Sequence, residues 1–272
     1  MESAALRQIG NELRKDIVTM CYESGAGHVG GSLSSADVLT VLYNEVMKHD
    51  PARPEWEERD RFVLSKGHIA EALFAVLAQQ GYLEKEELHT FSKFGSRLIG
   101  HPNNKIPGIE MNTGALGHGV CVAAGMALAG KLNDDPGYVY CLMGDGEQAE
   151  GSVWEAAMAA AHYELDHLVL MLDRNGLQIS GNTEDVMSLK DIRLKYEAFG
   201  FNVIEVDGHD YDALKAAFTL ARSSQGKPSL LLLHTVKGKG VSFMENVPAW
   251  HHGVLNEAQY KQALEELEGA YE

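Results

Sequence analysis

The sequence has no long apolar run and little proline, with seven prolines in 272 residues. A membrane-spanning helix needs about 20 consecutive apolar residues, and no segment approaches that length. The N-terminus mixes charged and apolar residues at helical spacing and lacks the basic start and apolar block of a secretory signal. These absences predict a cytoplasmic protein that does not associate with membranes.

Cysteine is also scarce. Cys21, Cys121 and Cys141 are odd in number and far apart in the chain. They fit neither the spacing of a metal site nor a disulfide framework, so we expect reduced, buried thiols.

Basic residues are few relative to acidic ones. The chain has 23 Lys and Arg against 39 Asp and Glu, a net charge of −16. Such an acidic surface argues against nucleic acid as a partner, because phosphate backbones are bound by clustered Lys and Arg. A small phosphorylated ligand remains compatible, since a metal ion, backbone N–H groups and a few local donors can hold it.

The second half of the chain alternates apolar runs with helical patterns, and the first half is mostly helical. Ser34 or Ser35 is a candidate cap for a helix that follows it. The expected strands are 61–65, 138–143, 167–172, 202–206 and 229–236. The expected helices are 3–23, 36–47, 67–80, 114–132, 151–163, 210–224 and 256–268, with loops at 24–35 and 173–193. Continuous apolar strands separated by helices predict an α/β fold with a parallel sheet flanked by helices.

Polar residues follow two of the apolar runs. Asp145 lies between Gly144 and Gly146 after one expected strand, and Asn175 follows the next, 30 residues later. Ligands of parallel sheets bind at the carboxyl ends of the strands, and oxygen ligands of this kind suit Mg²⁺ or Ca²⁺. Glycines and a helix start allow a phosphate to approach the backbone. The long loop 173–193 is therefore expected to be functional.

Histidine is abundant, with twelve residues, several of them in glycine-flanked loops. Imidazoles donate hydrogen bonds to phosphate or sugar oxygens and move protons near neutral pH. The histidines in question are His28, His68, His101, His118, His251 and His252. Their spacing does not match a zinc site, and the sequence has no HExxH motif, nucleophile elbow or Walker A loop.

The motifs SGAGHVGGSLS, RDRFVLSKGHIAEALFAVL, LIGHP, NTGALGHGVCVAAGMALA, GDGEQAEGSVWEA, DRNGLQISG and WHHG occur in this order. Over essentially the whole chain this pattern resembles the N-terminal half of transketolases. The resemblance implies a single domain, 1–272, with the pyrophosphate-binding fold of thiamine diphosphate enzymes. Its histidine motifs point to transketolase rather than to decarboxylases.

The resemblance also implies roles for individual residues. Asp145, Asn175 and the carbonyl of Leu177 resemble the ligands of the metal, Mg²⁺ or else Ca²⁺ or Mn²⁺. Gly144, Gly146 and His68 lie where the family contacts the diphosphate, and Gly114 and Leu116 where it contacts the aminopyrimidine. Ile179 resembles a thiazolium contact, and Glu150 the glutamate that links two cofactor sites across the dimer. His28, His101 and His251 or His252 resemble the histidines that contact the substrate and assist proton transfer.

Two positions depart from the family pattern, and a pair of histidines aligns ambiguously. Arg174 replaces the first residue of an Asn-Asn pair, and His118 stands where Gln is common. His251 and His252 both follow Trp250, so the alignment alone leaves the functional one open, and the Trp-His order favours His251.

The resemblance ends where a full transketolase would continue with the domain that supplies a glutamate for the aminopyrimidine. The chain is thus expected to be a fragment or one subunit of a split enzyme, and its charged final helix favours a subunit. We expect a C-terminal partner subunit, an α2β2 heterotetramer and sugar or sugar-phosphate substrates. Two alternatives are a subunit of another thiamine diphosphate enzyme, resembling 1-deoxyxylulose-5-phosphate synthase or a 2-oxo acid dehydrogenase, and a non-catalytic cofactor-binding half-protein.

Overall fold

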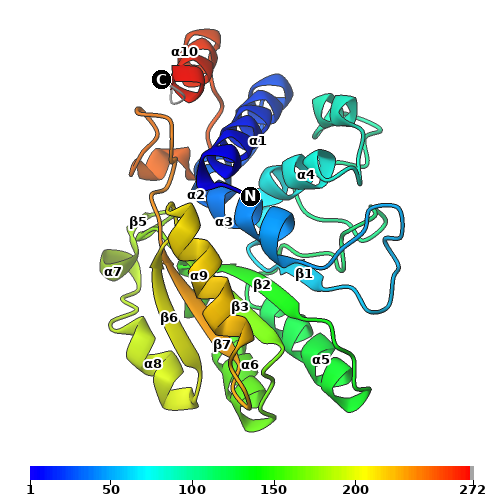
Figure 1. Cartoon of the computed structure of the whole chain (residues 1–272). Coiled ribbons are helices and arrows are strands. Elements are labelled where there is room, and N and C mark those ends of the chain that lie inside the picture. Colours follow the sequence, from blue (N-terminus) through cyan, green and yellow to red (C-terminus); the bar gives the residue numbers. More distant parts are fainter. Residues whose placement is uncertain (270–272) are drawn as a thin grey trace.

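The structure is a computed structural model, described here for residues 1–269. Its centre is a five-stranded sheet in the order β1-β2-β3-β7-β6, with every neighbouring pair parallel (Figure 1). The strands are β1 (Arg61–Leu64), β2 (Val139–Gly144), β3 (Leu168–Arg174), β6 (Asn202–Asp207) and β7 (Ser229–His234). The predicted parallel sheet flanked by helices is confirmed.

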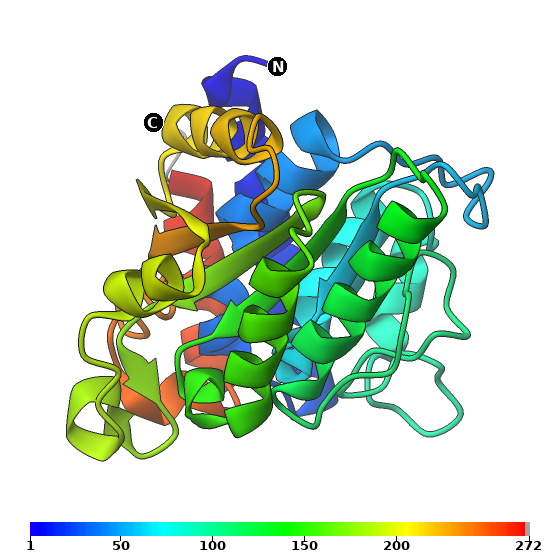
Figure 2. The ribbon, with the colours of Figure 1, turned by 90° about the horizontal axis from the view of Figure 1, so that it is seen from below.

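Helices cover both faces of this sheet, as Figure 2 shows for α5 and α6 on one face. The helices are α1 (Ser3–Ser24), α2 (Val29–Ser34), α3 (Ala36–Val41), α4 (Ala70–Gln79), α5 (His118–Leu132), α6 (Gly151–His162), α7 (Thr183–Val186), α8 (Ile192–Phe199), α9 (Tyr211–Arg222) and α10 (Glu257–Gly269). Successive strand residues point to opposite faces, so Tyr140 and Leu142 of β2 join one apolar core while Cys141 and Met143 join the other. Burial on both faces explains why the strands are apolar throughout.

The segment 24–35, expected to be a loop, is helical from Val29 onward. Ser35 occupies the N-cap position of α3, but its hydroxyl does not cap that helix. The hydroxyl donates instead to the carbonyl of Gly31 and to Asp173 Oδ2. The predicted serine cap is therefore wrong, because the hydroxyl donates its hydrogen bond elsewhere, to groups that include a buried carboxylate. The helix expected at 36–47 ends as a π-helical turn, Leu42–Val46, and the one expected at 114–132 begins only at His118.

The segment 173–193 is more regular than expected. It contains a two-stranded antiparallel hairpin of β4 (Leu177–Gln178) and β5 (Gly181–Asn182), followed by α7. Strands of two residues are too short to produce a periodic pattern, which explains why no sign of them is visible in the sequence.

No helix in residues 1–269 is long and apolar enough to cross a membrane. All three cysteines are free, but Cys121 is only partly buried, unlike Cys21 and Cys141. The predicted domain 1–272 includes residues 270–272, which lie outside the described part of the chain.

Candidate functional site

A cavity of about 380 Å³ opens at the carboxyl end of the sheet. Gly144 at the end of β2 pairs with Asp173 of β3, and Arg174 pairs with His234 of β7, so three strands end at nearly the same level. The loops that follow them form the wall, together with α2 and the 310 turn Gly67–Ile69. Besides glycines, the lining residues are His28, Lys66, His68, Leu116, Asp145, Glu147, Asn175, Leu177, Gln178, Ile179, Ser180, Lys237 and His251.

Asp145 has one carboxylate oxygen without a partner. Its Oδ2 accepts hydrogen bonds from the guanidinium of Arg174 at 3.0 Å and from the N–H of Gly176 at 2.6 Å. Its Oδ1 is buried and accepts none within the described residues. Burial, followed by the negative charge of Asp173, raises the pKa of Asp145 to about 6. A buried unpaired carboxylate oxygen is unfavourable, and a hard cation would satisfy it.

Asn175 and Leu177 lie beside Asp145 in the cavity wall. The Asn175 side chain accepts from the N–H of Leu177 at 3.1 Å and donates to Asp173 at 3.1 Å. Residues 1–269 contain no group of three or more His, Cys, Asp or Glu that could hold a metal. A cation here would therefore be bound by one carboxylate with amide and carbonyl oxygens, which is a donor set that Mg²⁺ accepts.

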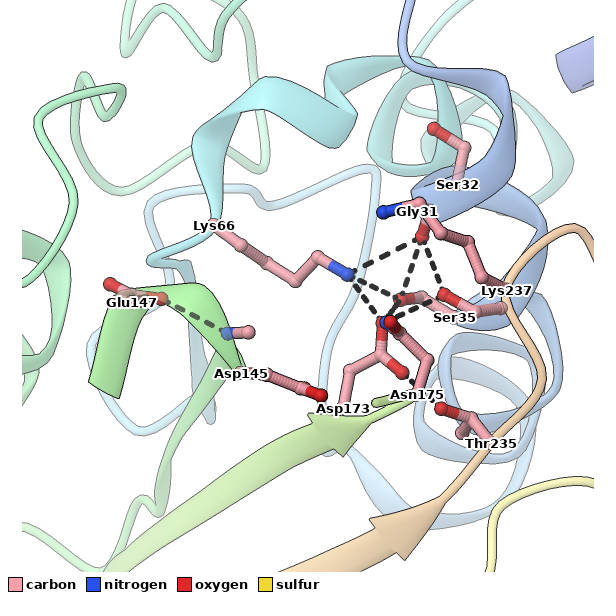
Figure 3. A network of polar contacts seen from close by, with 12 residues as sticks. Gly31, Ser32, Ser35, Lys66, Asp145, Glu147, Asp173, Asn175, Thr235 and Lys237 are labelled. Atoms are coloured by element: carbon pink, nitrogen blue, oxygen red, sulfur yellow. Dashed lines mark hydrogen bonds and ion pairs between the residues drawn. The ribbon is translucent and has the colours of Figure 1, made fainter. Parts of the chain in front are cut away.

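Lys66 and Asp173 form a buried ion pair at the bottom of the cavity, with nitrogen and oxygen 2.5 Å apart (Figure 3). Burial disfavours the Asp173 carboxylate, but Lys66 and the hydroxyls of Thr235 and Ser34 more than compensate and hold its pKa below its usual range. Sequence reasoning missed this pair. The signal was available in SKGH at 65–68 and in the position of Asp173 at the end of an apolar run.

Lys237 is a second lysine in this cavity. It belongs to the loop after an expected strand, where ligands of parallel sheets bind, although the resemblance assigns it no role. Its Nζ lies 2.9 Å from Nδ1 of His251, and no carboxylate within the described residues pairs with it. Burial, together with the positive charge of Lys66, lowers the pKa of Lys237 to about 8. The cavity thus contains a cation that is free to meet an anionic ligand.

Four imidazoles gather around one side of the cavity. The ring of His28 lies 5.1 Å from that of His68, 5.5 Å from His251 and 4.9 Å from His252, centre to centre. Burial, then the neighbouring imidazoles and Lys237, lowers the pKa of His28 to about 4. Burial and Lys237 lower that of His251 to about 3. Both rings are therefore neutral near pH 7. His28 can donate and accept a hydrogen bond, whereas His251 already accepts from Lys237 at Nδ1 and has its Nε2–H left as a donor.

Glu147 joins three of the loops that form the cavity. Its carboxylate accepts from the Ser65 hydroxyl, from the N–H of Gly117 at 2.8 Å and from the N–H of Gly144 at 3.1 Å. These donors belong to the segments after β1, before α5 and at the end of β2. Glu147 is 1% exposed, and burial raises its pKa. The sequence placed it in GDGE without any indication of its three partners.

Glu71 lies behind His28 and is completely buried. It accepts from the N–H of His28 at 2.8 Å and from the Ser32 hydroxyl at 3.1 Å. Gly27 makes this approach feasible, because a Cβ there would lie 2.6 Å from Glu71 Oε1 and the backbone has a φ of 138°. Glu71 therefore fixes the backbone that carries His28.

The remaining predicted residues lie at the rim. A Cβ on Gly114 would be 2.8 Å from the ring of His101, so these two residues are in close contact. His101 is exposed and does not line the cavity, and neither does Glu150, which lies exposed beside Gly117. Ile179 lines the opening and is 74% exposed. A ligand in the cavity would remove part of this apolar side chain from water.

A family model described as transketolase, thiamine diphosphate binding domain, matches residues 6–269. The chain belongs to this transketolase family. An apulose-4-phosphate transketolase subunit from Phocaeicola vulgatus is 48% identical to it over 267 residues, which are 98% of this chain and 95% of that protein. The 6-deoxy-6-sulfo-D-fructose transketolase subunit SqwG of a Clostridium species is 46% identical over 97% of this chain and 96% of its own length.

Solved transketolases have the same fold. The enzyme from Campylobacter jejuni superimposes with a TM-score of 0.94 and 33% identity, over 98% of this chain. The chain spans only 43% of that transketolase, whereas it spans nearly all of the two bacterial relatives named as subunits.

Within this transketolase-family domain, one cavity brings together most of the residues that the sequence singled out. The predicted residues that line it are His28, His68, Gly114, Leu116, Gly144, Asp145, Gly146, Asn175, Leu177, Ile179 and His251. His252 contacts the same histidine cluster from a more exposed position.

Proposed function

We propose that this chain is the N-terminal subunit of a two-chain transketolase. In this proposal it binds the diphosphate and the divalent metal of thiamine diphosphate. Together with a C-terminal partner subunit it transfers a two-carbon ketol unit from a ketose, or ketose phosphate, to an aldose. The observation that carries the proposal is the unpaired, buried Oδ1 of Asp145, in a cavity that also contains Lys66 and Lys237.

The side chains in the cavity fit a metal-bound diphosphate. Asp145, Asn175 and the carbonyl of Leu177 would hold the ion, Mg²⁺ or else Ca²⁺ or Mn²⁺. Lys237 and His68 would meet the diphosphate, and Gly146 would allow it to approach the backbone. The bound cofactor would supply the electron sink that carbon–carbon cleavage requires.

The histidines would act on the sugar. His28 is neutral at pH 7, so it can accept a proton from one hydroxyl and donate to another oxygen. His251 is also neutral, but its Nδ1 already accepts from Lys237, so His251 would donate to the sugar from Nε2. His101 lies at the rim, where it would contact a hydroxyl further along the substrate. Lys237 would orient the His251 ring through the contact at Nδ1.

A partner chain is supported by exposed apolar surface on α5 and α6. The solvent-facing side of α5 includes Val122, Gly125, Ala129 and Leu132, so this helix has little polar surface. Met158 of the neighbouring α6 is 57% exposed, and Glu150 precedes the same helix. The names of the bacterial relatives specify subunits. We therefore propose an α2β2 assembly in the cytoplasm, in which residues 1–272 form one domain and Glu150 links the two cofactor sites.

The decisive experiment measures ketol transfer by this chain alone, by an isolated C-terminal transketolase subunit and by their mixture. We expect activity only in the mixture, without release of carbon dioxide. Full activity of this chain alone would contradict the split site, and carbon dioxide release would favour a different thiamine diphosphate reaction. If metal-dependent cofactor binding occurs and no partner confers activity, the chain is a cofactor-binding protein instead.

A binding experiment tests the metal site separately. Titration calorimetry with thiamine diphosphate and Mg²⁺ should show at least about a hundredfold weaker binding for Asp145→Asn, because the carboxylate ligand is lost. Asp185→Asn, in the exposed α7 of the same segment, should bind like the unmodified chain. Equal affinities of the two variants would remove Asp145 from the site.

A further inference from the structure

A second cavity, of about 250 Å³, lies along the loop that follows β7. Lys237 of this loop lines the first cavity, whereas Lys239 and Gly240 line the second. The other walls come from α1, from α3, from the start of α9 and from α10, which lies next to α1 (Figure 1). The two cavities thus share one loop but no lining residue.

The carboxylate in this second cavity is already fully bonded. Asp37 accepts two hydrogen bonds from Arg14, at 2.9 and 2.6 Å, one from the Tyr211 hydroxyl, and one from His209 Nδ1 at 2.8 Å. His209 is oriented by its other nitrogen, which accepts from the N–H of Val236 at 2.8 Å. The charge of Asp37 is therefore balanced by Arg14 and does not leave a site for a cation.

Two hydrogen-bond donors on α1, Asn11 and Arg7, do not bond to Asp37. Asn11 is 6% exposed, and its Nδ2 is buried without a hydrogen-bond partner in the described residues. Arg7 lies one helical turn earlier, so the two side chains share a face of α1. The Arg7 guanidinium rests 5.8 Å from the centre of the Tyr211 ring, and no carboxylate of residues 1–269 pairs with it. The buried Asn11 amide therefore lacks an acceptor, and the exposed Arg7 guanidinium beside it is free to bind the same anion.

The charges around the cavity are mostly positive. Its lining includes three cations, Arg7, Arg14 and Lys239, against the single carboxylate of Asp37. Glu245 lies 3.5 Å from Lys239, so Lys239 is partly compensated and Arg7 remains the uncompensated charge. A positive cavity in a chain of net charge −16 is a local feature that disfavours cations and favours anions.

We propose that this second cavity binds a small anion, a phosphate group or a short carboxylate, through the Arg7 guanidinium and the Asn11 amide. Both groups present N–H donors, and guanidinium is suited to two-point contact with such oxygens. The volume is several times the ~30 Å³ that a water molecule occupies in the liquid, which leaves room for an anion of this size. The site is separate from the proposed cofactor site and does not depend on it.

The test titrates inorganic phosphate, and malonate in parallel, into the full chain by calorimetry. Thiamine diphosphate and Mg²⁺ are present at saturating concentrations, so that the first cavity is blocked. The variants are Arg7→Gln and Asn11→Leu, with Arg53→Gln as a matched surface control, since Arg53 does not line the cavity. Arg7 is exposed, so its substitution leaves the fold intact even if Asn11→Leu does not fold.

We expect saturable binding of one anion per chain, weakened at least about tenfold by Arg7→Gln and by Asn11→Leu and unchanged in the control. A crystal grown with the tighter anion should show it within hydrogen-bond distance of Asn11 Nδ2. Preference for phosphate over malonate would assign a phosphorylated ligand, and the reverse a carboxylate. Absence of saturable binding, or equal affinity in Arg7→Gln and the unmodified chain, would overturn the proposal.

Discussion

Asp37 and Glu71 are both buried carboxylates, yet their surroundings shift their pKa values in opposite directions. Burial disfavours ionisation of Asp37, but Arg14 and His209 more than reverse this effect and hold its pKa below its usual range. Glu71 accepts from neutral donors, namely backbone N–H groups and the Ser32 hydroxyl, and burial raises its pKa to about 7. The charge of Asp37 is thus balanced by a cation of the chain, Arg14. Glu71, behind His28, has no cation beside it in the described part of the chain.

This difference shows how the molecule divides its positive charge. Arg14 is committed to Asp37, with additional donation to the carbonyl of Lys239. In and behind the wall of the first cavity, Glu147 and Glu71 accept hydrogen bonds from neutral donors, so neither forms an ion pair with Lys237. The carboxylates of that wall position loops, and the lysine remains available for an anion.

The largest effect should come from removing the cation beside Asp37. Arg14→Met should lower the free energy of unfolding by about 3–5 kcal/mol, because a buried charge loses its partner. Urea unfolding measures this, with the exposed Arg193→Met as control. Cofactor affinity of the folded variant should change less than about threefold, since Arg14 is outside the first cavity. Stability like that of the control would contradict the contrast drawn between the two carboxylates.

Glu71→Gln should raise the free energy of unfolding, in contrast to Arg14→Met, and only at higher pH. Below pH 4.5 the carboxyl is protonated in both folded and unfolded chains. Between pH 4.5 and about 7 the unfolded chain ionises while the folded chain keeps its proton, so stability falls as pH rises. We compare the free energy of unfolding of the variant with that of the unmodified chain at each pH. This difference should be about 3 kcal/mol more favourable to the variant at pH 8 than at pH 4. Urea unfolding at both pH values, with Glu84→Gln as an exposed control, measures this gain, and a pH-independent difference would count against it.

His209, next to Asp37, and His251, in the first cavity, differ in the same way as the two carboxylates. His209 has both nitrogens bonded within the protein, whereas His251 faces the cavity. In the complex with the partner subunit, His251→Asn should lower kcat about a hundredfold, because a proton-transferring group is lost. His252→Asn should lower it less than about tenfold, since His252 is exposed and does not line the cavity. The reverse order of effects would assign the role to His252.

The smallest effect should come from Glu147→Gln. The amide can accept from two of the three donors, but its NH₂ group cannot accept from Gly144. We expect cofactor affinity to fall about tenfold, corresponding to about 1.4 kcal/mol. Calorimetry with Glu155→Gln on α6 as control measures this, and a loss of unfolding free energy without a change in affinity would reduce Glu147 to a structural role.

The sheet could be predicted because its strands are continuous apolar runs, and the residues at their ends followed from that placement. Asp145 and Asn175 were found in this way, because both directly follow a strand. The hairpin at 177–182 could not be predicted, since two paired residues per strand leave no periodicity. The helical nature of 29–34 was hidden by its glycines and serines, which ordinarily indicate a loop.

The sequence gives the positions of these polar residues at strand ends but not which long-range partners they pair with. Lys66 and Asp173 are 107 residues apart, and Asp37 and Tyr211 are 174 apart. A lysine or an aspartate in a sequence usually indicates a solvated position, and only the three-dimensional arrangement shows that these are buried and paired. The same limit applies to Glu147, whose three donors come from three separate loops.

Arg174, which stands in the sequence as a departure from the family pattern, ties Asp145 to Glu184 at the start of α7. This guanidinium therefore attaches the segment of the β4–β5 hairpin and α7 to the strand ends without any metal ion. If the proposed ion binds at Asp145, a chelator should therefore remove it while the hairpin stays folded against the strand ends. Metal would then be lost and regained reversibly, without the chain having to refold each time.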